Sequence, residues 1–248
     1  MKDIVSFMSR LKKTKNGNKK RGAKHMEEQN RIYLSGSILN VKPIEVHSKV
    51  VEIQDLLDYI HIDVMDGIFV PEKTNGIEMF KNACRVEKVA LDVHLMVEEP
   101  QRVISNFEGA SIITFHIETI INDKTMTIDM DKFNSLSKEI RSMGAKVGVA
   151  VKPNTTESLL RIIMPKVDLI LIMTVEPGYG GQQLIQHTLN KIENVRKMGF
   201  KGLLEVDGGV TVDNSVELRK RGANVIVAGT KLFGSYDMRR AAEEIKGM

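Results

Sequence analysis

Short apolar runs alternate with longer amphipathic stretches along the chain from Arg31 onward. The runs are rich in Ile, Val and Leu, and their lengths suit strands that are buried on both faces, as in a parallel sheet. They occupy residues 32–39, 59–65, 89–97, 111–118, 146–153, 168–177, 202–209 and 224–233. The pattern therefore predicts eight parallel strands.

The stretches between the runs predict helices, because in several of them apolar residues recur at three- and four-residue intervals. Eight are expected, including residues 100–110, 157–167 and 183–200. Glycine suits the left-handed position that ends a helix, and several stretches close on one: Gly109, Gly144, Gly199 and Gly222. Eight strands alternating with eight helices predict an α/β fold, a single (β/α)8 TIM barrel over residues 31–248. An open doubly wound sheet is the alternative.

The charge is divided unevenly along the chain. The net charge is +4, yet residues 1–25 hold nine Lys or Arg and one Asp, so the remainder is mildly acidic. Residues 1–30 are predicted to be a disordered basic extension, because they carry few apolar residues. Either a solvated tail or a true start at Met26 explains this segment, so we do not expect nucleic-acid binding despite the charge.

Two absences in the sequence narrow the class of protein. Cys84 is the single cysteine, which excludes an intramolecular disulfide framework and a cysteine-rich zinc site. No apolar stretch approaches the roughly 20 residues that span a membrane. We therefore expect a cytoplasmic protein with no membrane partner.

Imidazole and carboxylate side chains gather at the ends of three predicted strands. Because side chains alternate along a strand, His61 and Asp63 share one face of their strand. His94 and Asp207 take the matching position on two others. Active sites of TIM barrels lie at this C-terminal face. Two imidazoles and two carboxylates there predict a site for one divalent cation, with Zn, Mn, Fe and Co all open.

Glycine-rich segments follow three neighbouring strands. They read EPGYGGQ at 176–182, DGG at 207–209 and AGT at 228–230. Barrels often bind phosphate with the loops after strands 7 and 8 and with a short helix. The three segments together predict a ligand that carries phosphate.

These segments resemble the ribulose-phosphate 3-epimerase family. The resemblance runs from about Leu34 to Phe233 and is strongest in the second and third predicted strands. It is carried by SIL at 37–39, HIDVMDGIFVP at 61–71, LDVHLMVEEP at 91–100, HIE at 116–118, IMTVEPGYGGQQ at 172–183, VDGGV at 206–210 and ANVIVAGTKLF at 223–233.

The resemblance implies a metal-dependent isomerase of the pentose phosphate pathway and of carbohydrate metabolism. Such an epimerase interconverts D-ribulose 5-phosphate and D-xylulose 5-phosphate through a cis-enediolate. It implies that His61, Asp63, His94 and Asp207 bind the metal and that Asp63 and Asp207 are the catalytic acid and base. A homo-oligomer is also implied. The implied substrate-binding residues are Ser37, His94, Met65, Met96, Met173, Gly178, Tyr179, Gly180, Gly181, Gly208, Gly209, Gly229 and Thr230.

The sequence departs from the family pattern in loops that follow strands 1, 2 and 5. The segment after SIL reads NVKPIEV, Glu72 stands where Asn is typical, and VKPNT occupies 151–155. The first alternative is therefore the same chemistry on a ketohexose phosphate, D-allulose 6-phosphate. A phosphate-binding lyase or synthase and a non-catalytic sugar-phosphate-binding protein are further alternatives. Asp66 faces away from His61 and Asp63, and we expect it to anchor a loop.

Overall fold

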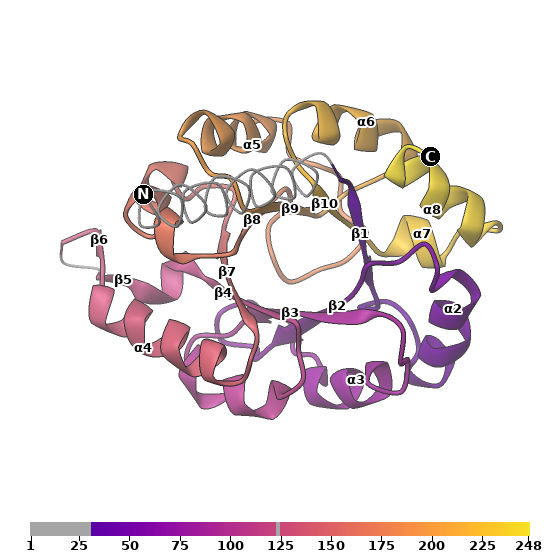
Figure 1. The fold of residues 1–248 in the computed structure, drawn as a ribbon, viewed down its shortest axis with the longest axis horizontal. Helices are drawn as coiled ribbons and strands as arrows, with labels where there is room; N and C mark the ends of the chain where they lie inside the picture. The colour runs from indigo at the N-terminus through magenta and orange to yellow at the C-terminus, as the bar shows by residue number, and fades with distance from the viewer. Residues whose placement is uncertain (1–30, 123–124) are drawn as a thin grey trace, which may run out of the picture. The chain divides into compact units, whose positions relative to one another are not determined.

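Eight parallel strands close into a barrel in the computed structural model, which describes residues 31–122 and 125–248 (Figure 1). The prediction for residues 1–30 lies outside the described residues. The barrel forms one compact unit over Ile32–Met248. Its strands are β1 (Tyr33–Ser37), β2 (Tyr59–Met65), β3 (Ala90–Met96), β4 (Ile112–His116), β7 (Lys146–Val151), β8 (Leu169–Met173), β9 (Leu203–Asp207) and β10 (Val225–Ala228). The order β1-β10-β9-β8-β7-β4-β3-β2 confirms the predicted TIM barrel.

The two faces of each strand have different neighbours. In β2, Ile60, Ile62 and Val64 belong to the large core that includes residues of the surrounding helices. His61 and Asp63 alternate with them and lie within reach of His94 and Asp92 from β3. The strand register pairs His61 with Asp92 and Asp63 with His94. The apolar outer face thus fixes a polar inner face, because side chains alternate along the strand.

Helices surround the barrel in the described residues (Figure 1). Seven are α-helical: α2 (Val46–Ile53), α3 (Gly76–Ala83), α4 (Met130–Ser142), α5 (Thr188–Lys197), α6 (Val212–Lys220), α7 (Thr230–Phe233) and α8 (Met238–Lys246). Side-chain caps start several of them. Asp129 accepts the backbone N–H groups of Asp131 and Lys132 at the start of α4, and Thr211 and Asn214 form a capping box at α6.

Two predicted helices were wrong. Residues 100–110 form the 3₁₀ segments Pro100–Arg102 and Ile104–Phe107, and residues 157–167 form Glu157–Ile162 and Met164–Lys166. Pro165 removes a backbone donor and prevents a continuous α-helix in the second stretch. In the first stretch Val103 has a φ of −120°, which interrupts the turn.

Two element boundaries and one additional strand pair also differ from the prediction. The expected helix over 183–200 begins only at Thr188, and the preceding residues form a loop. The last run ends as a strand at Ala228, and Thr230–Phe233 form the short helix α7. A small antiparallel pair, β5 (Ile121–Asn122) and β6 (Thr127–Ile128), was not predicted. Pro43–Glu45 and Ile117–Ile120 are also 3₁₀ segments.

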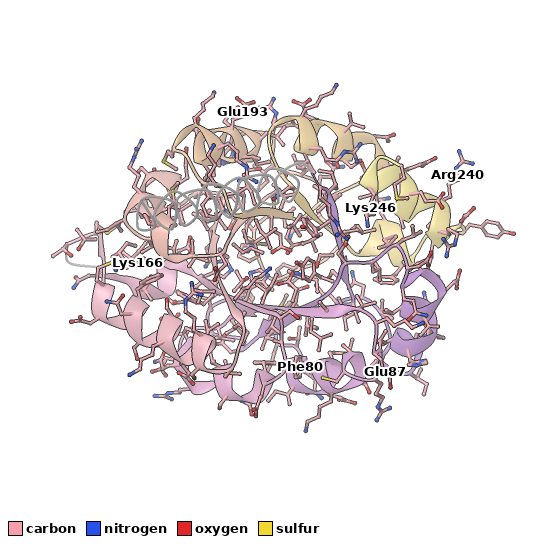
Figure 2. The ribbon with its side chains drawn as sticks, in the orientation of Figure 1. Phe80, Glu87, Lys166, Glu193, Arg240 and Lys246 are labelled. Carbon is pink, nitrogen blue, oxygen red and sulfur yellow. The ribbon has the colours of Figure 1, made fainter. Side chains whose placement is uncertain are left out.

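Aromatic and charged contacts hold the outer layer in place (Figure 2). The Phe80 ring of α3 packs edge-on against Phe107, with centroids 5.3 Å apart. Lys246 of α8 bonds to Asp58 at 2.8 Å. The helices among residues 31–122 and 125–248 include none long and apolar enough to cross a membrane.

Candidate active site

Four side chains at the C-terminal ends of β2, β3 and β9 converge inside the barrel mouth. They are the predicted metal-ligating residues His61, Asp63, His94 and Asp207. His61 and His94 are fully buried, and Asp63 is 6% exposed. The strand order places β9 and β2 on either side of β1 and β10, so the two aspartates approach from different parts of the barrel wall.

The facing atoms of these residues are spaced as ligands of one cation would be. Asp63 Oδ1 lies 3.4 Å from His61 Nε2 and 3.2 Å from His94 Nδ1. Asp207 Oδ2 lies 3.9 and 3.8 Å from the same nitrogens. Ligands about 2.1 Å from a tetrahedral ion stand roughly 3.4 Å apart. His61 Nε2 is buried without a hydrogen-bond partner among the described residues. The residues present therefore fit a divalent cation.

The electrostatics of the two aspartates differ. Burial alone would raise the pKa of Asp63, but the charges and hydrogen bonds of His61 and His94 hold it well below its usual range. Burial and the neighbouring Asp63 charge raise the pKa of Asp207. The two carboxyls therefore differ in how strongly their surroundings favour the ionised form.

A second polar layer lies beneath His61. Its Nδ1–H donates to Asp92 Oδ2 at 2.7 Å, and the Ser35 hydroxyl donates to the same oxygen at 3.1 Å. In a neutral imidazole this bond leaves Nε2, which faces Asp63 Oδ1 at 3.4 Å, free to bind a cation. Burial and the adjacent Asp92 raise the pKa of Glu205, whose carboxyl completes the layer. The sequence pattern alone indicates no role for Asp92 or Glu205, although strand alternation places each one layer below a predicted ligand.

His94 has a different support. Its Nε2 lies 2.9 Å from Nε2 of His116, at the end of β4. His116 Nδ1 in turn lies 3.1 Å from Glu118 Oε2. Both residues belong to the HIE segment, which carried the resemblance but suggested no role for either side chain.

A pocket opens above the four residues and contains most of the predicted substrate-binding side chains. Asp63 and Asp207 line its floor beside three methionines, while the two histidines lie beneath its surface. The predicted residues that line it are Ser37, Met65, Met96, Met173, Gly178, Tyr179, Gly180, Gly181, Gly208, Gly209, Gly229 and Thr230. Ser37 donates to Asp63 Oδ2 at 3.1 Å. The structure therefore brings the set to one place.

The glycine segments form one wall of this pocket. Gly208 and Gly209 have φ values of 117° and 65°, which L side chains rarely adopt. The Thr174 side chain ties β8 to this turn by donating to the carbonyl oxygen of Asp207 at 2.9 Å. Sequence reasoning missed Asn40, which donates to the Thr230 hydroxyl at 2.9 Å and lines the same wall. Gln182, Thr211 and Lys231 were also missed.

Asp66 anchors a loop, as predicted. Its Oδ1 accepts the N–H groups of Ile68 and Phe69 at 2.8 and 2.9 Å, and its Oδ2 accepts that of Glu98 at 2.8 Å. Although burial opposes the shift, these bonds lower the pKa of Asp66. The carboxylate thus joins the loop after β2 to the loop after β3.

Replacing Asp66 with Ala should therefore weaken the fold more than the chemistry. Loss of bonds to a charged acceptor should cost about 2 kcal/mol, or roughly 4–8 °C in Tm for a domain of this size. Thermal denaturation with steady-state kinetics checks this. We expect kcat to fall less than tenfold, and a loss as deep as that of an Asp63 variant would contradict the anchoring role.

Comparison with known proteins agrees with this geometry. Residues 33–233 match the model of the ribulose-phosphate 3 epimerase family. The chain is 40% identical over 225 residues to ribulose-5-phosphate-3-epimerase, chloroplastic, of Arabidopsis thaliana, covering 88% of this chain and 76% of that protein. It is 41% identical over 197 residues to ribulose-phosphate 3-epimerase of Bacillus subtilis, covering 77% and 86%.

Solved structures share the fold at lower identity. The 3-hexulose-6-phosphate synthase of Salmonella typhimurium superposes with a TM-score of 0.68 at 14% identity, covering 87% of this chain and 97% of that one. A 3-keto-L-gulonate-6-phosphate decarboxylase of Vibrio cholerae gives 0.65 at 12% identity, covering 88% and 96%. These likenesses show the barrel alone. Family and relatives confirm the predicted class, an isomerase of the epimerase type. The chain belongs to the ribulose-phosphate 3 epimerase family.

Proposed function

We propose that this protein interconverts D-ribulose 5-phosphate and D-xylulose 5-phosphate by inverting C3. The observation that carries the proposal is the placement of Asp63 and Asp207 at the floor of one pocket, with glycine-rich loops at its wall. The curated relatives described above carry this activity in their names. A lyase or synthase explains the pair of carboxylates less well, because its chemistry does not need an acid and a base on opposite faces of one carbon.

His61, Asp63, His94 and Asp207 would hold one divalent cation. Bound there, the ion would stabilise negative charge on the substrate oxygens next to C3. The set of two imidazoles and two carboxylates suits Zn, Mn, Fe or Co. The bound ion would also compensate the charge of the two carboxylates, which are held close together.

The two aspartates would carry the proton. One carboxylate removes the C3 proton from one face of the substrate, and the other carboxyl returns a proton to the opposite face of the planar enediolate. Asp63 and Asp207 come from different strands, β2 and β9, and both line the pocket, which suits proton transfer on two faces of one carbon. Reversing the reaction exchanges their roles. Met65, Met96 and Met173 line the pocket beside them and would exclude water from the reacting carbon.

The phosphate would lie against the glycine segments and the first residues of α7. Gly229 and Thr230 reach the pocket from that helix, and Gly208 and Gly209 reach it from the turn after β9. Backbone N–H groups can approach a phosphate closely where no side chain intervenes. His94 and Ser37 lie nearer the reacting end, where Ser37 would bond the sugar.

Gly209→Ala should damage this phosphate site. An added Cβ would lie 2.4 Å from the Leu184 nitrogen, at a φ of 65°. The loop must shift, so KM should rise at least about tenfold, equivalent to 1.4 kcal/mol of lost binding. Gly199→Ala is the matched control, because Gly199 also has a positive φ but nothing within 4 Å of the added carbon. Equal KM values for the two variants would contradict the assignment.

A coupled assay of the purified protein with D-ribulose 5-phosphate tests the proposed function. D-allulose 6-phosphate is the comparison substrate, and metal content is measured on the same preparation. We expect the pentose phosphate to give the higher kcat/KM. Failure to epimerise either sugar with one bound divalent cation per chain would overturn the proposal. The family resemblance also implies a homo-oligomer, which light scattering of the purified protein would test.

A further inference from the structure

His94 contacts the candidate cation site with one ring nitrogen and a second histidine with the other. Its Nδ1 faces Asp63 Oδ1 at 3.2 Å and Asp207 Oδ2 at 3.8 Å. Its Nε2 faces His116 Nε2 at 2.9 Å. Both imidazoles are completely buried. Two ring nitrogens at hydrogen-bond distance must share one proton, so the direction of this bond decides which nitrogen of His94 is free to bind a cation.

Glu118 lies at the far end of the series His94–His116–Glu118 and fixes the direction of the bond between the two imidazoles. Glu118 Oε1 accepts the backbone N–H of Lys152 at 2.8 Å, and Oε2 lies 3.1 Å from His116 Nδ1. An ionised carboxylate only accepts hydrogen bonds. His116 must therefore carry its proton on Nδ1, because a bare nitrogen would face a negative oxygen.

The remaining assignments follow from this one. A neutral His116 with a proton on Nδ1 has a bare Nε2, which accepts from His94 Nε2–H. A neutral His94 with its proton on Nε2 then directs a bare Nδ1 toward Asp63 Oδ1, and a cation bound between these two atoms would compensate both. The reverse order would place a protonated Nδ1 against the ion and a bare His116 nitrogen against Glu118.

The charge of Glu118 agrees with this order. Burial opposes ionisation of Glu118, but hydrogen bonds from His116, the Thr155 hydroxyl and the Lys152 N–H lower its pKa to about 2. An ionised Glu118 accepts a hydrogen bond from His116 Nδ1–H, as the 3.1 Å distance between the two atoms allows.

We propose that His116 and Glu118 are positioning residues that hold His94 in the tautomer whose Nδ1 binds the cation. The proposal rests on the cation site of the proposed function. Asp92 supports His61 there, and His116 with Glu118 would give His94 a separate support. His61 receives a carboxylate directly on Nδ1, whereas His94 receives one through an intervening imidazole. The two ligands therefore offer different ring nitrogens, Nε2 of His61 and Nδ1 of His94.

Nitrogen-15 spectra of the zinc-loaded wild-type protein read the tautomers directly. With ¹⁵N-labelled histidine, we expect His94 to be protonated at Nε2 and His116 at Nδ1. Signals are assigned through single-histidine variants. Protonation of His94 at Nδ1, or of His116 at Nε2, would overturn the proposal, and so would a wild-type protein that binds no zinc. The tautomers are read from the wild-type spectrum, in which the buried network is unchanged, and the variants serve only for assignment.

The isosteric variant Glu118→Gln tests the coupling. A Gln amide has one acceptor oxygen, so it cannot serve both Lys152 N–H and His116 Nδ1–H. We expect zinc affinity by calorimetry to fall about 10–100-fold, with folding checked by circular dichroism. Glu157→Gln, which loses a carboxylate bonded to Asn194 outside the site, is the control and should bind within twofold of wild type. Equal affinity of Glu118→Gln and wild type would contradict the proposal.

The same preparations separate this inference from the proposed function. Predicted tautomers without turnover of either sugar phosphate would defeat the proposed function and leave the positioning role standing. Turnover with the reversed tautomers would defeat the positioning role and leave the epimerase standing.

Discussion

Asp63→Asn and Asp207→Asn should each lower kcat at least about 1,000-fold while the barrel stays folded. General acid–base groups contribute about 10²–10⁴-fold each, and inversion needs both. Asn keeps the size of Asp and an acceptor oxygen, so the Ser37 bond to residue 63 is retained. Steady-state kinetics and circular dichroism check the two parts. Full activity in either variant would contradict proton transfer by two aspartates.

Isotope exchange distinguishes these variants further. Each aspartate lines the pocket from its own strand, β2 or β9, so each should abstract the proton of one epimer only. In D2O, the Asp63 variant should exchange the C3 proton of one pentulose phosphate and the Asp207 variant that of the other, with neither forming product. Exchange of the same epimer by both variants would show that a single base serves both directions.

Removal of the cation is the second large effect. Dialysis against a chelator should reduce turnover below about 1% of its initial value, because two carboxylates and two imidazoles lose the charge that organises them. Added cation at 100 times its Kd should stabilise the fold by about 2.7 kcal/mol, or roughly 5–10 °C in Tm. Calorimetry and the coupled assay measure both.

The identity of the ion supplies the control. Zn, Mn, Fe or Co should restore turnover, since imidazole nitrogens favour these ions, whereas Mg prefers oxygen ligands and should restore little. Full activity in protein with less than about 0.1 cation per chain would contradict the account of the site.

The sequence predicted the barrel because short apolar runs alternate regularly with stretches of helical apolar spacing. Every run assigned as a strand contains a barrel strand in the structure, since runs rich in β-branched residues favour strands that are buried on both faces. The glycines that end the stretches before the fourth, fifth, seventh and eighth runs all have a positive φ. The candidate metal-ligating residues come together for a related reason, because alternation places His61 and Asp63 on one face and the strand register aligns Asp63 with His94.

Other features depend on contacts that no local pattern records. Residues 100–110 have apolar spacing compatible with a helix, yet they form 3₁₀ turns. Asn40 and Thr230 are 190 residues apart and meet only because β1 and β10 are neighbours in the closed barrel. His116 faces His94 for the same reason, as β3 and β4 pair in parallel. The sequence thus predicted the candidate ligands but not the side chains that contact them from neighbouring strands.

The most direct test of the central claim is the reaction of D-ribulose 5-phosphate in D2O with the cation-loaded protein, followed by NMR at C3. Proton transfer by two aspartates should give D-xylulose 5-phosphate carrying solvent deuterium at C3, because the proton removed on one face is replaced from the other by a solvent-exchangeable carboxyl. Xylulose 5-phosphate that retains the original C3 hydrogen, or no product at all, would contradict it.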